Sequence, residues 1–221
     1  MVEGRKMVNE LMAADFEIAY LFVTEKYAAE NGIPSDKAET VTEVQMEQMS
    51  GQDTAPGILA VVKQPKKQAI DPKARLVLAL DGIANPGNLG TIIRTADWFG
   101  LHDIVCSDDC VELWNPKVIQ ATMGSLFRTR IVYTDLAQFL SEKKTEGKAI
   151  YGALLNGENL FERQGEAAGV VVIGSESHGI RPDILPLITH PITIPRDANS
   201  QTESLNASIA AAIIMAEMRR K

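Results

Sequence analysis

The sequence predicts an α/β fold in two parts, a small N-terminal α/β domain and a C-terminal domain built on a parallel sheet. Over the last two thirds of the chain, apolar strand-like segments alternate with helical ones, which is typical of a parallel sheet covered on both faces. A stretch with two prolines and four lysines, residues 63–73 (KQPKKQAIDPK), separates this pattern from a shorter one before it. We therefore expect domains at residues 1–65 and 75–221, joined by a linker at 66–74.

The N-terminal part alternates short helices and strands. Apolar residues recur at helical spacing within residues 4–14 and predict a helix there: Met7, Val8, Leu11 and Met12. Strands are expected at residues 19–24, 41–44 and 57–62, and helices at 27–30 and 43–49. The last strand (GILAVV) is almost wholly apolar, so it should be buried.

The C-terminal part contains six apolar segments that predict strands, at residues 76–80, 103–106, 130–133, 149–154, 169–173 and 191–194. Helical patterns lie between most of them, at residues 89–99, 116–123, 135–145, 182–188 and 205–219. Ligands of open parallel sheets bind beyond the carboxyl ends of the strands. We therefore expect the functional residues in the loops at that edge.

Composition excludes several classes of protein. No run of about 18 apolar residues occurs, and the first residues (MVEGRKMVNELMAADFE) carry charges in place of an apolar leader. We therefore expect a cytoplasmic protein with no membrane partner. Cys106 and Cys110 are too few for a disulfide framework, and too few Cys or His lie nearby for a metal site, so we expect reduced thiols and no metal.

Charge alone argues mildly against nucleic acid as a partner. The net charge is −7, and neither the first 74 residues nor the remainder is basic overall. Phosphate contacts normally supply much of the affinity for nucleic acid. The lysines of the linker leave two interpretations open, a solvated tether or a basic strip that contacts RNA: Lys66, Lys67 and Lys73.

The first segment that carries chemistry is LDGIANPGNLGTIIRTADWFG, residues 80–100. A strand should end at Leu80, and a helix should begin near Asn88, which is a good N-cap. The buried stripe of that helix should consist of Ile92, Ile93, Ala96 and Phe99. Arg94 lies off this stripe, so without further information it is a surface arginine. The loop lacks GxGxxG, and no GxxxxGK[ST] occurs in the chain, which counts against a nucleotide-dependent α/β enzyme.

The second segment is VVVIGSESHGI, residues 170–180, where a β-branched strand runs into a glycine turn. Gly174 permits close approach of a ligand to the backbone, so a side chain there should block the ligand and leave the fold intact. Glu176 can accept hydrogen bonds or orient a positive group. The alternative is a glycine-punctuated turn with a solvated glutamate. His178 is a candidate base because histidine titrates near neutrality, although polar surface is the simpler interpretation.

The third segment is ITIPRDANSQTESLNASIAAAIIMAEMRR, residues 192–220, a strand end followed by a polar loop and a long helix. Thr202 or Ser204 is expected to cap the helix. Alanines keep much of the helix narrow enough for close packing: Ala207, Ala210, Ala211, Ala212 and Ala216. The alternative is a capped core helix without chemistry. SLN is not a nucleophile elbow, because GxSxG is missing.

Together, and in this order, NPGNLGTIIRTAD, VVIGSESHG and IPRDANSQTESLNASIAAAI resemble the three motifs of the SpoU (TrmH) family of RNA 2′-O-ribose methyltransferases, in the SPOUT superfamily. The resemblance runs from about residue 76 to the C-terminus. Through VEGRKMVNELM, residues 1–65 more loosely resemble the ribosomal-protein-like RNA substrate-binding domain that precedes the catalytic domain in many members.

The resemblance implies a trefoil knot in the C-terminal domain, a topology that general chain rules would otherwise exclude. It also implies S-adenosylmethionine as cofactor and a homodimer whose subunits share each active site. The positions that match the cofactor cradle are Gly174, Ile194, Leu205 and Leu154. The positions that match the catalytic and structural polar set are Asn88, Arg94, Glu176, Ser204 and Asn206. The loop between Pro195 and Ser204 is longer than usual, which leaves its cofactor contacts open.

In this reaction a ribose 2′-hydroxyl attacks the sulfonium methyl in line, and positioning alone can contribute on the order of 7–11 kcal/mol. The family assigns the arginine that matches Arg94 to activating the hydroxyl. Because arginine keeps its proton in nearly all settings, an equal alternative is that it clamps the target phosphate and stabilises alkoxide charge. The expected substrate is ribosomal RNA, because a separate module suits a large structured RNA. A transfer RNA substrate and an RNA-binding module without catalysis are the alternatives, and the intact polar set argues against the second.

Overall fold

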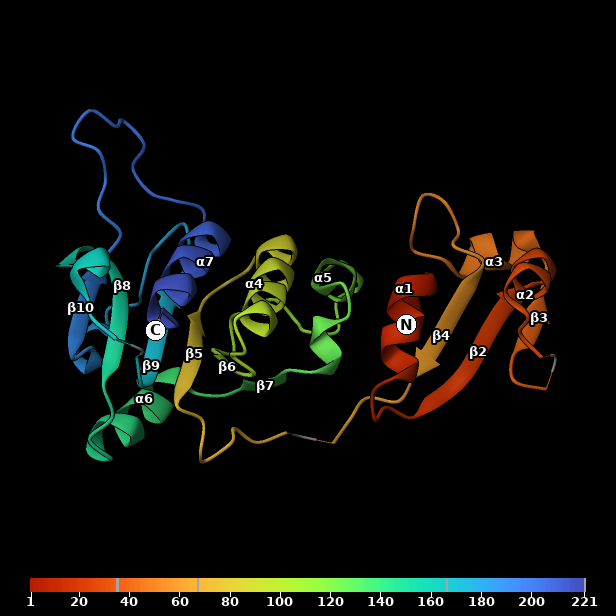
Figure 1. Ribbon diagram of the computed structural model, residues 1–221, viewed down its shortest axis with the longest axis horizontal. Coiled ribbons are helices and arrows are strands. Elements are labelled where there is room, and N and C mark those ends of the chain that lie inside the picture. Colours follow the sequence, from red (N-terminus) through yellow and green to blue (C-terminus); the bar gives the residue numbers. More distant parts are fainter. Residues whose placement is uncertain (35, 67, 166, 221) are drawn as a thin grey trace.

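The structure is a computed structural model that describes residues 1–34, 36–66, 68–165 and 167–220. Within these residues the strands form two sheets, one of four strands and one of six. Figure 1 shows the two sheets as separate units, joined by an extended segment that runs along one side of the molecule. We call them the N-unit and the C-unit. The expected small α/β domain followed by a parallel-sheet domain is confirmed.

The N-unit is a sheet of order β1-β4-β2-β3 with three short helices. Its strands are β1 (Val2–Glu3), β2 (Ile18–Thr24), β3 (Glu39–Val41) and β4 (Ile58–Val62), and its helices are α1 (Arg5–Met12), α2 (Glu25–Asn31) and α3 (Glu43–Met49). β2 pairs in parallel with β3 and antiparallel to β4. The strand expected at residues 41–44 ends earlier because Thr42 forms a capping box with Gln45 and starts α3.

The C-unit is a six-stranded sheet of order β10-β8-β9-β5-β6-β7 in which every pair is parallel. Its strands are β5 (Leu76–Asp81), β6 (Asp103–Cys106), β7 (Arg130–Tyr133), β8 (Ile150–Asn159), β9 (Gly169–Gly174) and β10 (His190–Thr193). Its helices are α4 (Pro86–Trp98), α5 (Pro116–Thr122), α6 (Leu136–Thr145) and α7 (Ala207–Met218), with 3₁₀ turns η1 (Ser125–Phe127), η2 (Leu160–Glu162) and η3 (Leu185–Leu187).

Helices cover both faces of this sheet, as a parallel sheet requires. Alternate residues of the central strand β5 point to opposite faces. Leu78 and its neighbours on that face join the apolar cluster that contains α4, α5 and α7. Val77 and Ala79 face the other way and join a second cluster with Leu136 and Leu140 of α6. The expected stripe on α4 is confirmed, since Ile92, Ile93 and Ala96 are fully buried and Phe99 packs beside them, while Arg94 is exposed.

Three expected helix boundaries were wrong. The stretch 182–188 forms only the turn η3, because Pro182 and Pro186 remove amide donors that a helix would need. α4 begins two residues before Asn88, at Pro86, and its N-cap is Asn85, whose side chain accepts from the amides of Gly87 and Asn88.

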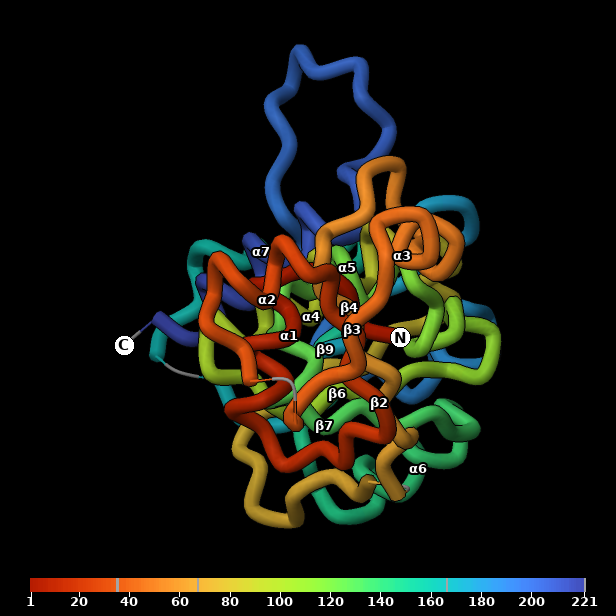
Figure 2. Tube along the Cα trace, turned by 90° about the vertical axis from the view of Figure 1, so that its right-hand side faces the viewer, coloured from red at the N-terminus to blue at the C-terminus, as the bar shows by residue number. Residues whose placement is uncertain are grey.

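The third boundary is the start of α7. Asn206 caps this helix, and neither Thr202 nor Ser204 does. Its Oδ1 accepts from the amides of Ser208 and Ile209, 3.0 and 3.3 Å away. Residues 194–206 therefore form one continuous loop before α7, and Figure 2 shows this loop projecting beyond the rest of the chain.

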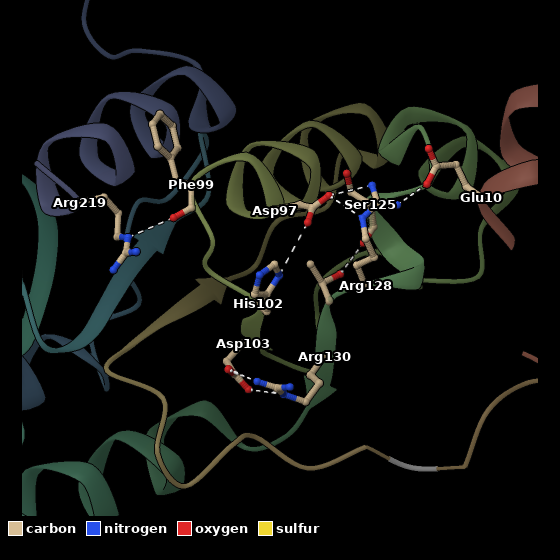
Figure 3. A network of polar contacts seen from close by, with 10 residues as sticks. Glu10, Asp97, Phe99, His102, Asp103, Ser125, Arg128, Arg130 and Arg219 are labelled. Atoms are coloured by element: carbon tan, nitrogen blue, oxygen red, sulfur yellow. Dashed lines mark hydrogen bonds and ion pairs between the residues drawn. The ribbon is translucent and has the colours of Figure 1, made fainter. Parts of the chain in front are cut away.

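Side chains join the N-unit to the C-unit. Arg128 bonds both Glu10 of α1 and Asp97 of α4 (Figure 3). Phe16 packs edge-on against Phe127, with ring centroids 5.2 Å apart. These contacts connect the N-unit to the end of the C-unit at which η1 lies.

The linker also contacts the edge of the C-unit sheet. Asp103 accepts from the amide of Asp71 and from two guanidinium nitrogens of Arg130. Burial of the Asp103 carboxyl opposes its charge, but these hydrogen bonds outweigh burial and hold its pKa below the ordinary value. Lys66 and Lys73 are exposed, and Lys67 lies outside the described residues.

The expected trefoil knot stays a prediction. The pairing of β8 with β10 jumps from Gly152 opposite Pro191 to Glu158 opposite Ile192, so residues 153–157 of β8 stand outside the ladder. The strands approach closely there, since a Cβ added to Gly157 would lie 2.7 Å from the carbonyl carbon of Pro191.

In the described part of the chain, no helix is long and apolar enough to cross a membrane.

Candidate active site

Three loops meet at the carboxyl edge of the C-unit sheet and bring together three of the expected polar residues. The side-chain amide of Asn88, in the first turn of α4, donates to Glu176, which follows β9. The side-chain amide of Asn206 donates to Asn88 over 3.0 Å and lies 3.5 Å from the same oxygen of Glu176. We call Asn88, Glu176 and Asn206 the polar cluster.

Asn206 serves two structural purposes at once. Its Oδ1 faces its own helix, where it accepts from two backbone amides and from the Ser208 hydroxyl at 2.7 Å. Its amide nitrogen therefore points outward to Asn88 and Glu176. Since capping fixes the orientation of this side chain, the start of α7 is held beside the start of α4.

A tight turn carries Glu176 into the polar cluster. Ser175 and Gly179 exchange two backbone hydrogen bonds of 3.1 and 2.9 Å, and Gly179 has a positive φ of +67°. A Cβ added to Gly174 would lie only 2.2 Å from the carbonyl carbon of Gly179. The turn itself therefore requires glycine at position 174. The expectation that a side chain there would leave the fold intact was wrong, because the backbone of the chain already fills the space.

An ion pair that sequence reasoning missed anchors the far end of this turn. Asp81 ends β5 beside Gly174 of β9, and its side chain is fully buried. Its two carboxylate oxygens accept from the amide and from the Nε of Arg181, each over 2.7 Å. Burial raises the pKa of the Asp81 carboxyl above its ordinary value, although Arg181 favours the charged form. No local pattern signals a partner 100 residues away.

Arg94 and Ser204 are not drawn into the polar cluster. Both side chains are exposed. Among the residues that the structure describes, neither has a hydrogen-bonding or ion-pairing partner. Arg94 shares its face of α4 with Trp98, one turn later, which is 85% exposed. The expected polar set thus divides into three bonded residues and two open ones.

The residues expected to hold the cofactor belong to strands that are neighbours in the sheet or to the loop that follows them. Leu154 of β8 and Ile194 after β10 are half-buried and pack against the two apolar clusters. Leu205, just before the cap of α7, is 44% exposed. Apolar side chains beside loop backbone suit an adenosine, which needs a flat apolar wall and a few polar groups that fix its orientation. These residues fit the adenosine of S-adenosylmethionine.

Titratable groups near the polar cluster offer no other obvious chemistry. His178 is exposed and its Nδ1 is 2.8 Å from the Ser177 hydroxyl. No three His, Cys, Asp or Glu side chains within the described ranges are grouped to hold a metal ion. Hydrogen bonding to Cys106 lowers the pKa of Cys110 to about 7 against the effect of burial, but both thiols are buried.

A parallel sheet with a polar cluster at its carboxyl edge, preceded by a separate small unit, is the architecture of an α/β enzyme built in two units. The chain belongs to the SpoU rRNA methylase family, whose model matches residues 75–216. A second model, described as RNA 2′-O ribose methyltransferase substrate binding, matches residues 1–68. The expected family, the SPOUT superfamily and the enzyme class of RNA 2′-O-methyltransferase are confirmed.

Relatives and solved structures extend this result over nearly the whole chain. The chain is 31% identical over 225 residues to the 23S rRNA (guanosine(2553)-2'-O)-methyltransferase RlmP of Bacillus subtilis, an alignment that covers 99% of this chain and 88% of that protein. A TrmH-family protein from Porphyromonas gingivalis superimposes with a TM-score of 0.87 at 35% identity, covering 99% of this chain and 88% of that one. An AdoMet-bound rRNA methyltransferase from Sinorhizobium meliloti gives 0.83 at 25% identity, covering 98% and 85%.

Proposed function

We propose that this chain transfers a methyl group from S-adenosylmethionine to a ribose 2′-hydroxyl of ribosomal RNA. The observation that carries the proposal is the polar cluster, which joins the three family motifs at the carboxyl edge of the sheet. The choice of ribosomal RNA is supported by the relative from Bacillus subtilis, which aligns with nearly the whole chain and acts on 23S rRNA.

S-adenosylmethionine supplies an electrophilic methyl group on a sulfonium. Leu154, Ile194 and Leu205 are the side chains that we assign to its adenosine, and the turn after Gly174 contributes backbone at the same edge. Cofactor-bound relatives include the rRNA methyltransferase from Sinorhizobium meliloti. We therefore assign the cofactor to the strands and loops that adjoin the polar cluster.

The polar cluster positions groups and does not itself carry a proton in this mechanism. The bonds of Asn88 to both of its partners fix the start of α4 against α7 and the turn after β9. Such preorganisation reduces the orientation that the chemical step must still achieve. Ser204, which is open, is assigned to the ribose or to the incoming phosphate.

Arg94 is assigned to the RNA. Its guanidinium is exposed, is unpaired among the described residues and lies six residues after Asn88 on α4. A planar guanidinium can bind a phosphate in a bidentate manner and can stabilise the alkoxide that forms as the 2′-hydroxyl loses its proton. We favour this role over that of a base, since a guanidinium gives up its proton only in exceptional settings.

A second copy of the chain completes the site in this proposal. Trp98 of α4 and Ile209 of α7, on helices that pack together, are 85% and 51% exposed. Arg94 lies on the same stretch of α4, so a partner that covers Trp98 also approaches Arg94. Sedimentation at micromolar concentration should give a mass near twice 24.1 kDa. An active monomer would contradict the shared site.

The domain roles follow from this function. We assign RNA binding to residues 1–65, the linker to 66–74 and catalysis to 75–221, with the knot formed by the loops that hold the cofactor. We also propose a cytoplasmic location, by analogy with the relative from Bacillus subtilis, which acts on 23S rRNA.

The direct test is a map of ribose methylation. Total RNA from cells with and without the gene should differ at one 2′-O-methylated position of ribosomal RNA, and purified protein should restore that mark on unmodified ribosomal RNA. Loss of a mark in transfer RNA instead would replace the substrate and keep the chemistry. No lost mark, together with no methyl transfer in vitro, would favour an RNA-binding module without catalysis.

A further inference from the structure

A pocket of about 250 Å³ lies between the two units, away from the polar cluster. The N-unit contributes Phe16 to it, the extended segment that joins the two units contributes Gln64 and Lys66, and the C-unit contributes Trp114 and Tyr133 among others. Both the units and the linker are therefore needed to form its walls. The family motifs include none of these five residues.

The aromatic side chains that line the pocket are held by contacts with residues around it. The Tyr133 hydroxyl donates to the carbonyl of Val111 over 2.5 Å, and Phe16 packs edge-on against Phe127. Trp114 is half-buried against the main apolar cluster. The aromatic surfaces are thus held in place before any ligand arrives, which lowers the entropic cost of binding one.

The polar groups at the rim remain available. Gln64 and Lys66 are both exposed, and within the described residues neither has a hydrogen-bonding or ion-pairing partner. An amide can pair with the edge of a base through a donor and an acceptor, and an ammonium group can bind a phosphate. The lining also includes the exposed carboxylate of Glu112, which can accept from the amino group of a base. Aromatic walls with free hydrogen-bonding and charged groups beside them are what proteins use to bind unstacked bases of single-stranded RNA.

We propose that this inter-unit pocket receives an unpaired nucleobase of the RNA substrate, at a nucleotide other than the one that is methylated. Its volume lies below the usual range of about 300–1,000 Å³ for sites of drug-sized ligands, which suits a single base better than a whole cofactor. The proposal rests on the proposed function, since it names how the same substrate is recognised.

A base in this pocket would couple recognition to catalysis. It would touch Phe16 of the N-unit and Trp114 of the C-unit at once, so it would bind best when the two units hold the relative position that Arg128 secures. The pocket would thereby fix the distance along the RNA between the recognised base and the target ribose. Specificity for one site would then come in part from the junction.

Tryptophan fluorescence gives a test that is independent of activity. The chain has two tryptophans, so Trp98→Phe leaves Trp114 as the reporter, and Trp114→Phe leaves Trp98, which does not line the pocket and which we assign to the subunit contact, as the control. GMP, AMP, CMP and UMP should be titrated separately into each variant. Saturable quenching by at least one nucleotide in Trp98→Phe, without saturation in Trp114→Phe, would support the pocket. No saturable quenching of Trp114, or equal quenching of both, would overturn it.

RNA binding and methyl transfer give the second test. Gln64→Ala removes an exposed side chain at no structural cost, and Trp114→Ala removes the stacking surface. Loss of a stacked base should weaken RNA binding on the order of tenfold for Trp114→Ala and less for Gln64→Ala, with S-adenosylmethionine binding unchanged. Phe161→Ala, an exposed aromatic on η2, is the control and should bind RNA as the wild type does.

The two proposals fail in distinguishable ways. If the wild type methylates RNA while Trp114→Ala and Gln64→Ala bind RNA as tightly as Phe161→Ala, the pocket inference is wrong and the function stands. If the wild type transfers no methyl group to any RNA, the proposed function fails, and the nucleotide titration still decides whether the pocket takes a base.

Discussion

The five polar residues of the expected active site fall into two groups that differ in how far the fold has already arranged them. Asn88, Glu176 and Asn206 are bonded to one another, although they come from three distant parts of the chain. Arg94 and Ser204 are exposed and unpaired among the described residues. The fold thus arranges three of the five side chains in advance and leaves exposed the two that we assign to RNA.

The supports of the two groups differ in the same way. Under the polar cluster lie a helix cap, a tight glycine turn and the buried pair of Asp81 with Arg181. Ser204 lies in the projecting loop of residues 194–206, where Arg196 donates to the carbonyl of Thr202 over 3.0 Å and closes the loop on itself. Backbone and buried contacts hold the first group, whereas an exposed loop carries Ser204.

The largest effect should come from breaking the turn beneath the cluster. Gly174→Ala places a Cβ within 2.2 Å of the Gly179 backbone, which forces the turn to shift. We expect a loss of about 3 kcal/mol in the free energy of unfolding, together with loss of cofactor binding and activity. Gly51→Ala is the control, because its Cβ would meet nothing closer than 3.5 Å. Equal stability of the two variants in urea titrations would show that the turn is not what requires glycine.

Arg94→Ala should lower activity without changing the free energy of unfolding, because the side chain is exposed and unpaired among the described residues. Exposed side chains without partners contribute within about 0.5 kcal/mol to stability, so melting and S-adenosylmethionine affinity should match the wild type. Methyl transfer should fall by about 100-fold or more, the usual loss when one group that stabilises developing negative charge is removed. A variant with full single-turnover activity would remove Arg94 from the site.

Arg94→Lys sharpens the same prediction, because lysine loses a proton more readily and cannot bind phosphate with two parallel bonds. If Arg94 is a clamp, the lysine variant should bind RNA less tightly, and its rate at saturating RNA should show no steep rise with pH. A rate that climbs steeply with pH would make the residue a base and contradict our assignment.

Asn206→Ala should lower stability and activity together, since the residue belongs to the bonded group. Loss of the cap should cost about 1 kcal/mol in the free energy of unfolding, and the turnover number should fall as α7 loses its link to Asn88. Ser204→Ala, two residues earlier and unpaired, is the matched control and should change stability by less than about 0.5 kcal/mol. Equal destabilisation by both substitutions would erase the distinction between bonded and open residues.

Sequence patterns predicted the sheet better than they predicted the ends of its helices. The six strands of the C-unit lay where apolar runs indicated, because burial on both faces leaves an apolar signature. β8 alone continues well past its expected end at residue 154, to Asn159. The start of a helix depends on capping hydrogen bonds to a single side chain. Asn85 and Asn206 form these bonds, although other suitable capping residues lie nearby. The polar cluster was expected only through the family motifs. The geometry of the cluster depends on contacts between distant parts of the chain, and so does the ion pair of Asp81 with Arg181. No local pattern records contacts across about a hundred residues.

The smallest effect that we expect concerns pH and the carboxyl group beneath the Glu176 turn. Burial raises the pKa of Asp81 above its ordinary value. The folded chain then holds the proton of Asp81 more tightly than the unfolded chain does. Ionisation of Asp81 therefore lowers the free energy of unfolding as the pH rises above about 4. Asp81→Asn keeps the shape and does not titrate. The free energy of unfolding of the wild type minus that of Asp81→Asn, measured by urea titration at each pH, should therefore fall as the pH rises from about 4. A difference that grows with pH would mean that the attraction of Arg181 outweighs burial. The ion pair of Asp81 with Arg181 would then stabilise the turn beneath the polar cluster through its charge and not only through its hydrogen bonds.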